Sequence, residues 1–106
     1  MLSASDREVA QTLKTRVRKI APVRSVRVYG SRARGDAGQE SDLDVYIELE
    51  RVTPALRQQI SEIAWEVGFA SDIVISTFVV TQDQLETGPI GASPIIANVM
   101  REGIPI

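Results

Sequence analysis

The sequence contains no cysteine and no histidine among its 106 residues. The absence of cysteine excludes disulfides, thiolate metal sites and cysteine nucleophiles. The absence of histidine excludes a Ser-His-Asp triad and any histidine general base. Any catalysis by this chain must therefore depend on carboxylates, hydroxyls, arginines or a bound metal ion.

Long apolar runs are also missing. No stretch approaches the roughly 18 consecutive apolar residues that a membrane-spanning helix requires. Charged residues occupy the N-terminal positions where a signal peptide would be apolar. We therefore expect a cytoplasmic protein with no membrane partner. The hydrophobic fraction of 43% and the length predict one soluble globular domain over residues 1–106.

Charge is distributed unevenly along the chain. Residues 1–34 contain nine lysines and arginines against two acids, whereas residues 35–106 contain three arginines against twelve acids. The first segment, at +7, could contact phosphates or an acidic partner, or it could be a solvated helix face. The second, at −9, would repel a phosphate backbone, so direct nucleic-acid binding is not expected.

Residues 1–41 are predicted to form a helix, a strand and a turn. Ser5 and Glu8 fit a capping box, and an apolar stripe at helical spacing follows as far as Pro22, which closes the helix. In residues 23–29, β-branched side chains are separated by polar ones, as in a strand. Residues 30–41 are rich in glycine, serine and aspartate, which predicts a turn with a short helical segment.

Residues 42–50 have the clearest strand pattern in the chain. Alternate side chains of a strand share one face of the sheet. One face is therefore apolar and the other mostly acidic, the two sets being Leu43, Val45, Ile47 and Leu49, and Asp42, Asp44, Tyr46, Glu48 and Glu50. This alternation predicts a strand with one side in the core.

The remaining residues predict a helix, a strand and two further helices. The first helix covers residues 51–68 with Thr53 as its N-cap, and a strand buried on both faces covers residues 72–80. A short helix starts at Thr81, and Ser93 opens a last helix that ends at Gly103. Residues 103–106 are apolar enough to pair with a sheet edge or a partner. The fold class is α/β (α+β), a small sheet with helices packed on it.

Asp42 and Asp44 are the first candidate metal ligands. On one face of a strand their Cβ atoms lie roughly 6–7 Å apart, so the two carboxylates repel each other unless a cation lies between them. Oxygen-rich sites of this kind suit Mg²⁺. Taken alone, the pair could also be an exposed polar face on an edge strand.

Gly30 and Ser31 lie ten residues upstream of this pair. Gly30 has no side chain, so a phosphate can approach the backbone closely, and Ser31 adds a hydroxyl. The amides of a following helical turn favour an anion, and Arg32 and Arg34 are within reach to add positive charge. The alternative is an ordinary Gly-Ser turn with two solvated arginines.

Asp72 is the third candidate carboxylate. At the start of the third predicted strand it shares a face with apolar residues, so it needs a partner or faces water at the strand end. Metal ligation beside Asp42 and Asp44 would supply that partner, and a third carboxylate could accept a proton from an attacking hydroxyl. Two Mg²⁺ ions about 3.5–4 Å apart would then stabilise attack on the α-phosphorus of a nucleoside triphosphate.

These residues resemble the nucleotidyltransferase superfamily that includes DNA polymerase beta, and within it the minimal nucleotidyltransferases (MNT). The family pattern Gly-Ser-x10-Asp-x-Asp matches Gly30-Ser31 and Asp42-Leu43-Asp44. The resemblance implies the nucleotidyltransferase fold with a small mixed β-sheet. It also implies that Asp42, Asp44 and Asp72 hold two Mg²⁺ ions and that Gly30 and Ser31, with Arg34 nearby, bind the triphosphate.

The resemblance also implies a partner. Members of this group act as antitoxins paired with HEPN ribonuclease toxins, and some transfer AMP from ATP to a tyrosine of the toxin. The chain has no room for an acceptor-binding domain, so we expect the acceptor to be another polypeptide, in a homo- or hetero-oligomer. Two alternatives stay open: an antitoxin that acts by binding alone, through the basic N-terminal third or the apolar residues 89–96, and an aminoglycoside-like small-molecule nucleotidyltransferase.

Overall fold

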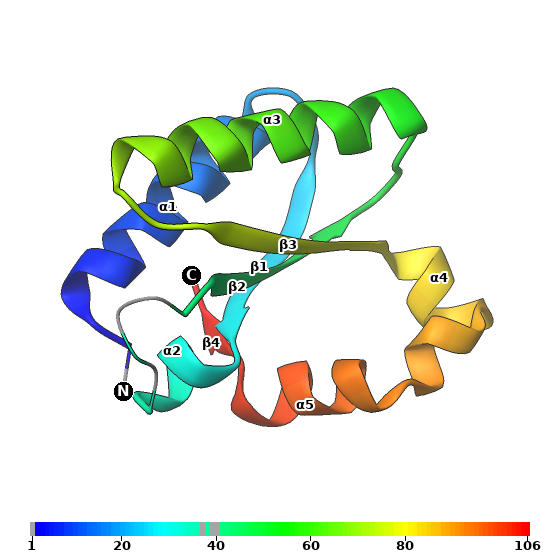
Figure 1. The fold of residues 1–106 in the computed structure, drawn as a ribbon. Helices are drawn as coiled ribbons and strands as arrows, with labels where there is room; N and C mark the ends of the chain where they lie inside the picture. Colours follow the sequence, from blue (N-terminus) through cyan, green and yellow to red (C-terminus); the bar gives the residue numbers. More distant parts are fainter. Residues whose placement is uncertain (1, 37, 39–40) are drawn as a thin grey trace.

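A four-stranded mixed sheet in the order β3-β2-β1-β4 forms the middle of the molecule (Figure 1). The computed structural model describes residues 2–36, 38 and 41–106. β2 lies parallel to β3, and β1 lies antiparallel to β2 and β4. The strands are β1 (Val23–Tyr29), β2 (Leu43–Leu49), β3 (Ile75–Thr81) and β4 (Ile104–Pro105). The predicted small mixed sheet is confirmed.

Helices cover both faces of this sheet. In Figure 1, α1 and α3 lie on one side of the sheet, whereas α4 and α5 lie on the other. No described helix is both long and apolar enough to cross a membrane. The helices are α1 (Ala4–Arg18), α2 (Ser31–Arg34), α3 (Pro54–Ala70), α4 (Gln82–Thr87) and α5 (Pro94–Glu102), with a 3₁₀ turn, η1 (Pro89–Ala92), before α5.

The larger core lies between the sheet and the helices α1 and α3. All four apolar residues predicted for one face of β2 are fully buried there. Leu13 and Val17 of α1 and Ile60 of α3 also have no exposed area and pack in the same cluster. The strand alternation read from the sequence is thus confirmed, because α1 and α3 take every apolar side chain on that face out of water.

A smaller core lies on the opposite face, which carries the aspartates. Tyr46, Val80, Ile96 and Val99 are buried in it, and Ile90 and Ile95 pack against it. The apolar residues expected to form a binding surface within 89–96 therefore serve largely as packing for α5 and η1. Ile96 is only 6% exposed, so the prediction that it forms part of a surface for binding a partner is wrong.

The helix boundaries follow from caps and packing. Thr53, Thr81 and Ser93 are the predicted N-caps and are confirmed. The first helix, however, is capped by Ser3, whose hydroxyl accepts the Asp6 amide at 3.0 Å, rather than by Ser5. α3 continues past Gly68 to Ala70, and Gly68 is buried against the turn before β3, where a Cβ would lie 2.6 Å from the Ile73 carbonyl oxygen.

The third strand starts later than the sequence predicted. It begins at Ile75, and Asp72 lies in the preceding turn with a φ of 58°. β3 is also an edge strand with mostly half-buried side chains, so burial on both faces was wrong. At the opposite edge, Ile104 and Pro105 pair with β1. Of the two roles predicted for residues 103–106, pairing with a sheet edge or with a partner, the structure shows the first.

Candidate active site

Gly30 holds the turn between β1 and α2 in a conformation that other residues rarely adopt. Its φ is 77° and its ψ is −158°, a region that is essentially restricted to glycine. A Cβ at this position would collide with the carboxylate of Asp44. Glycine is therefore required twice, for the backbone angle and for the close approach of Asp44. Ser31 begins α2 directly after this turn.

Asp44 is the second residue of β2 and lies on the sheet face of the smaller core, and Asp42 directly precedes the strand. Asp42 is exposed and Asp44 is half-buried. Tyr29 of β1 and Ser76 of β3 are the strand neighbours of Asp44 on its two sides. Sequence reasoning missed both neighbours, because only the pairing register of the three strands identifies them.

The pKa of Asp44 is raised above the usual range of an aspartate. Partial burial is the main cause and the charge of Asp42 adds to it, while Arg34 acts in the opposite direction. The pKa of Tyr29 is raised by burial and by the charge of Asp44. The site thus concentrates negative charge that a cation would neutralise. The donor set of two carboxylates fits Mg²⁺.

The structure does not bring Asp72 to this pair. Within the described residues, no three acidic side chains come close enough together to hold a metal ion. The sequence pattern predicted Asp72 at the start of the third strand. In the structure, Ser76 is the β3 residue that lies beside Asp44. The ligand role of Asp72 stays a prediction, while the described part of the site offers two carboxylates and a neighbouring hydroxyl.

Arg34 lies at the end of α2 and is exposed. Its guanidinium contacts Asp36 and Glu102 of α5, each at 3.1 Å. The hydrogen bond and charge of Asp36 raise the pKa of Arg34, so the side chain carries its positive charge beside the carboxylate pair. It can therefore serve the triphosphate role predicted for it, by exchanging an exposed carboxylate partner for a phosphate.

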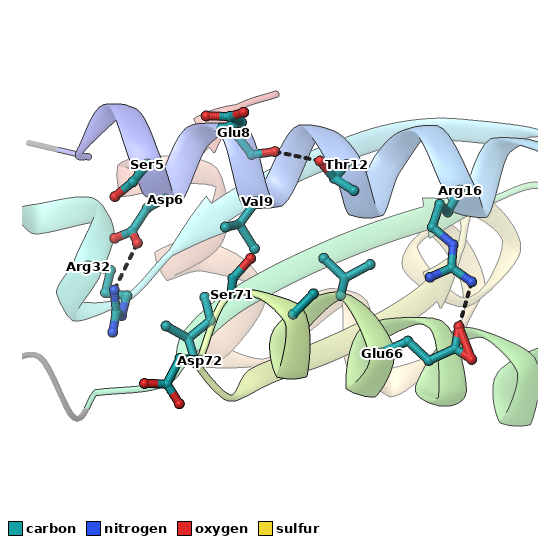
Figure 2. A pocket seen from close by; sticks show the side chains of 13 residues that line it. Ser5, Asp6, Glu8, Val9, Thr12, Arg16, Arg32, Glu66, Ser71 and Asp72 are labelled. Carbon is teal, nitrogen blue, oxygen red and sulfur yellow. Dashed lines mark hydrogen bonds and ion pairs between the residues drawn. The ribbon is translucent and has the colours of Figure 1, made fainter.

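Arg32 has a different role from the one expected. Its Nη1 donates to Asp6 of α1 at 2.8 Å and its Nε donates to the Ser41 carbonyl at 2.7 Å. Figure 2 shows this ion pair at one end of a cavity of about 700 Å³ between α1 and α3. Both side chains are only 11% exposed. Arg32 therefore links α2 to Asp6 of α1 and to Ser41, the residue before Asp42. Its guanidinium serves these contacts within the fold rather than binding a phosphate.

An Arg32→Ala variant should lose about 3 kcal/mol of unfolding free energy, because it leaves the Asp6 carboxylate buried without its cation. Urea denaturation followed by circular dichroism would measure the loss. Arg34→Ala is the matched control, since it removes an exposed arginine from the same helix and should change stability much less than Arg32→Ala does. Equal effects of the two substitutions would contradict the role of Arg32 as a structural tie.

Part of the basic N-terminal third is also engaged within the fold. Arg16 contacts Glu66 of α3 at 2.6 Å, a contact that Figure 2 shows crossing from α1 to α3, and Arg24 contacts Glu48 at 3.4 Å. These arginines hold elements of the same chain together. The segment therefore offers a partner less positive charge than its composition indicates.

Tyr46 shares the face of the aspartates but is fully buried. Its hydroxyl donates to Glu48 at 2.8 Å, and its ring stacks on Phe78 with centroids 6.5 Å apart. Burial and the hydrogen bond to Glu48 raise the pKa of Tyr46 far above its usual range. The hydroxyl of Tyr46 is therefore bonded to Glu48 within the fold, and its ring is part of the smaller core.

Comparisons with known proteins bear on the family and the fold of the chain. The profile of the family described as "nucleotidyltransferase domain" matches residues 10–104. No curated protein matches the chain.

Solved structures show the same fold. A candidate minimal nucleotidyltransferase has a TM-score of 0.65 and 23% identity, with 100% of this chain and 97% of that chain covered. A toxin–antitoxin structure with AMP-PNP has a TM-score of 0.59 and 19% identity, and a mutant of the toxin–antitoxin MntA-HpeT has 0.60 and 16%. In both cases, 94% of this chain and 70% of the other are covered.

Proposed function

We propose a function from the premise that this chain belongs to the nucleotidyltransferase domain family. The chain transfers AMP from ATP to a hydroxyl group of another protein, and it does so as the antitoxin of a toxin–antitoxin pair. The acceptor is a tyrosine of a HEPN-type toxin, which the transfer inactivates. Two of the similar structures are toxin–antitoxin complexes, and one of them contains the ATP analogue AMP-PNP, which supports this reading.

One observation carries the proposal: the Asp44 carboxylate lies directly against the backbone of Gly30. A triphosphate lying over the turn of Gly30 and Ser31 would therefore meet the carboxylate pair. Asp42 and Asp44 would hold Mg²⁺, which when bound would neutralise charge on the phosphates. Ser31 offers its hydroxyl and Arg34 a guanidinium for the same phosphate oxygens.

The transfer is an in-line substitution at the α-phosphorus. The oxygen of the acceptor hydroxyl forms a bond to phosphorus while the bond from phosphorus to the bridging oxygen of pyrophosphate breaks. Pyrophosphate leaves, and the proton of the acceptor hydroxyl passes to water. The residues of this chain hold the triphosphate and the attacking oxygen in line, which can supply several kcal/mol of the barrier reduction.

The experiment that tests the proposal is the intact mass of a HEPN protein after incubation with this chain, ATP and Mg²⁺. We expect a gain of one or more whole AMP units on the HEPN protein, together with release of pyrophosphate. Omitting Mg²⁺ by adding EDTA should abolish the gain. A HEPN protein that binds the chain but keeps its mass under these conditions would contradict the transfer reaction.

A second candidate function is neutralisation by binding alone. Its support is that Ser76, rather than an acid, lies beside Asp44, so the described site holds fewer carboxylates than the predicted two-ion site requires. The Asp42→Asn, Asp44→Asn double variant separates the two functions. If it still suppresses the ribonuclease activity of the toxin as well as the wild type does, binding is sufficient and the transfer is not the basis of neutralisation.

A further inference from the structure

Two aromatic side chains on α3 are exposed to solvent. Trp65 is 68% exposed and Phe69 is 74% exposed, and their rings stack with centroids 5.2 Å apart. Val74, in the turn after α3, is 64% exposed. A single exposed apolar side chain is ordinary, but stacked Trp and Phe rings beside a third apolar residue are typical of a surface that contacts another protein.

These residues line a groove of about 760 Å³ between α3 and the start of β3. Ser41, Asp72 and Ile75 also line it. Ser41 precedes Asp42, so one end of the groove opens where the candidate active site begins. A polypeptide lying in the groove would therefore continue toward the carboxylate pair.

The groove reaches Ile75, the first residue of β3, which is an edge strand of the described sheet. β3 is an edge strand and contains no charged residue and no proline, two common protections against strand pairing. The Val74 carbonyl accepts the Leu43 amide, so main-chain groups of alternate residues, beginning with Ile75, point away from β2. Arg57 donates to one such group, the Val79 carbonyl, at 3.1 Å, which leaves the part nearer the groove for another strand.

The charge of the groove indicates the kind of occupant. Asp72 contributes a carboxylate to its wall and Asp42 follows at its end, while no lysine or arginine is among its described lining residues. An apolar segment with a basic residue would complement this surface. A second copy that pairs through its own β3 fits less well, because that strand contains no charged residue and would bring no basic group to the carboxylates of the groove.

We propose that the acceptor protein docks an extended, apolar segment with a basic residue in this groove, beside β3 and over Trp65 and Phe69. This inference rests on the proposed function, because it specifies where the acceptor of that reaction binds. The stacked rings supply most of the contact, as buried aromatic side chains do at protein interfaces. The edge of β3 supplies main-chain hydrogen bonds.

The first measurement uses the single tryptophan of the chain. When 5-fluorotryptophan is incorporated into this chain alone, Trp65 gives the only ¹⁹F resonance, and an unlabelled HEPN protein adds none. We expect this resonance to shift or broaden as the HEPN protein is added. An unchanged resonance at saturating HEPN protein would overturn the proposed docking site.

The second measurement compares variants. Trp65→Ser, Phe69→Ser should weaken HEPN binding at least about 30-fold by calorimetry, while its affinity for AMP-PNP stays within about twofold of the wild type. Ile20→Ser, Met100→Ser is the matched control, because these residues are apolar and 41% and 45% exposed but lie away from α3, in the turn after α1 and on α5. Equal HEPN affinity of wild type and the Trp65, Phe69 variant would also overturn the inference.

The outcomes distinguish this inference from the function on which it rests. A HEPN protein that gains AMP equally with wild type and with the Trp65, Phe69 variant leaves the transfer reaction intact and removes the docking site. A HEPN protein that neither binds nor gains mass removes both. A ¹⁹F resonance that changes with the concentration of this chain alone, together with a doubled mass in solution, assigns the groove to a second copy instead.

Discussion

An Asp44→Asn variant should lose nucleotidyl transfer by about three orders of magnitude, a loss of about 4 kcal/mol of transition-state stabilisation. The substitution keeps the shape of the side chain but removes the charge that would hold Mg²⁺ against the triphosphate. Stability should not fall. Burial and the charge of Asp42 raise the pKa of Asp44, so in the absence of a cation the ionised group opposes folding.

Two measurements on the same variant check this result. Initial rates of AMP incorporation give the loss of activity, and urea denaturation without Mg²⁺ should give an unfolding free energy equal to or above that of the wild type. Mg²⁺ should stabilise the wild type but not Asp44→Asn. A variant that is inactive because it unfolds at lower urea concentration would refute the assignment of Asp44 to the reaction.

Gly30→Ala should reduce stability and transfer together. The backbone angles of Gly30 belong to a region that costs a residue with a side chain about 1–3 kcal/mol. The added methyl group would also displace the Asp44 carboxylate that it meets. We therefore expect an unfolding free energy lower by about 2 kcal/mol and a transfer rate reduced by about two orders of magnitude or more.

Gly38 provides the control for this substitution. It lies in the connection between α2 and β2, and no atom lies within 4 Å of a Cβ added there. Gly38→Ala should therefore leave both stability and activity close to wild type. In an Asp44→Ala background, Gly30→Ala should cost less stability than in the wild type, because the collision is gone. An unchanged cost there would contradict the close approach of Gly30 and Asp44.

The local signals in the sequence were sufficient for most of the fold. The alternation in residues 42–50 predicted which side chains of β2 enter the core, and three of the N-caps were identified correctly. Such signals depend on neighbours along the chain. They failed at the first helix, where Ser3 and Ser5 have the same spacing to an acidic residue and the structure has Ser3 as the N-cap.

By itself, the sequence determined that this is a nucleotidyltransferase-like domain with Gly30, Ser31, Asp42 and Asp44 as the candidate site, because that pattern is local. Tertiary structure alone decided which groups surround Asp44, because the register between strands brings Tyr29 and Ser76 beside it. It also decided that Arg32, facing Asp6, is a structural tie while Arg34 stays exposed. The exposed groove of Trp65 and Phe69 likewise depends on how α3 packs, since burial is a property of the assembled fold.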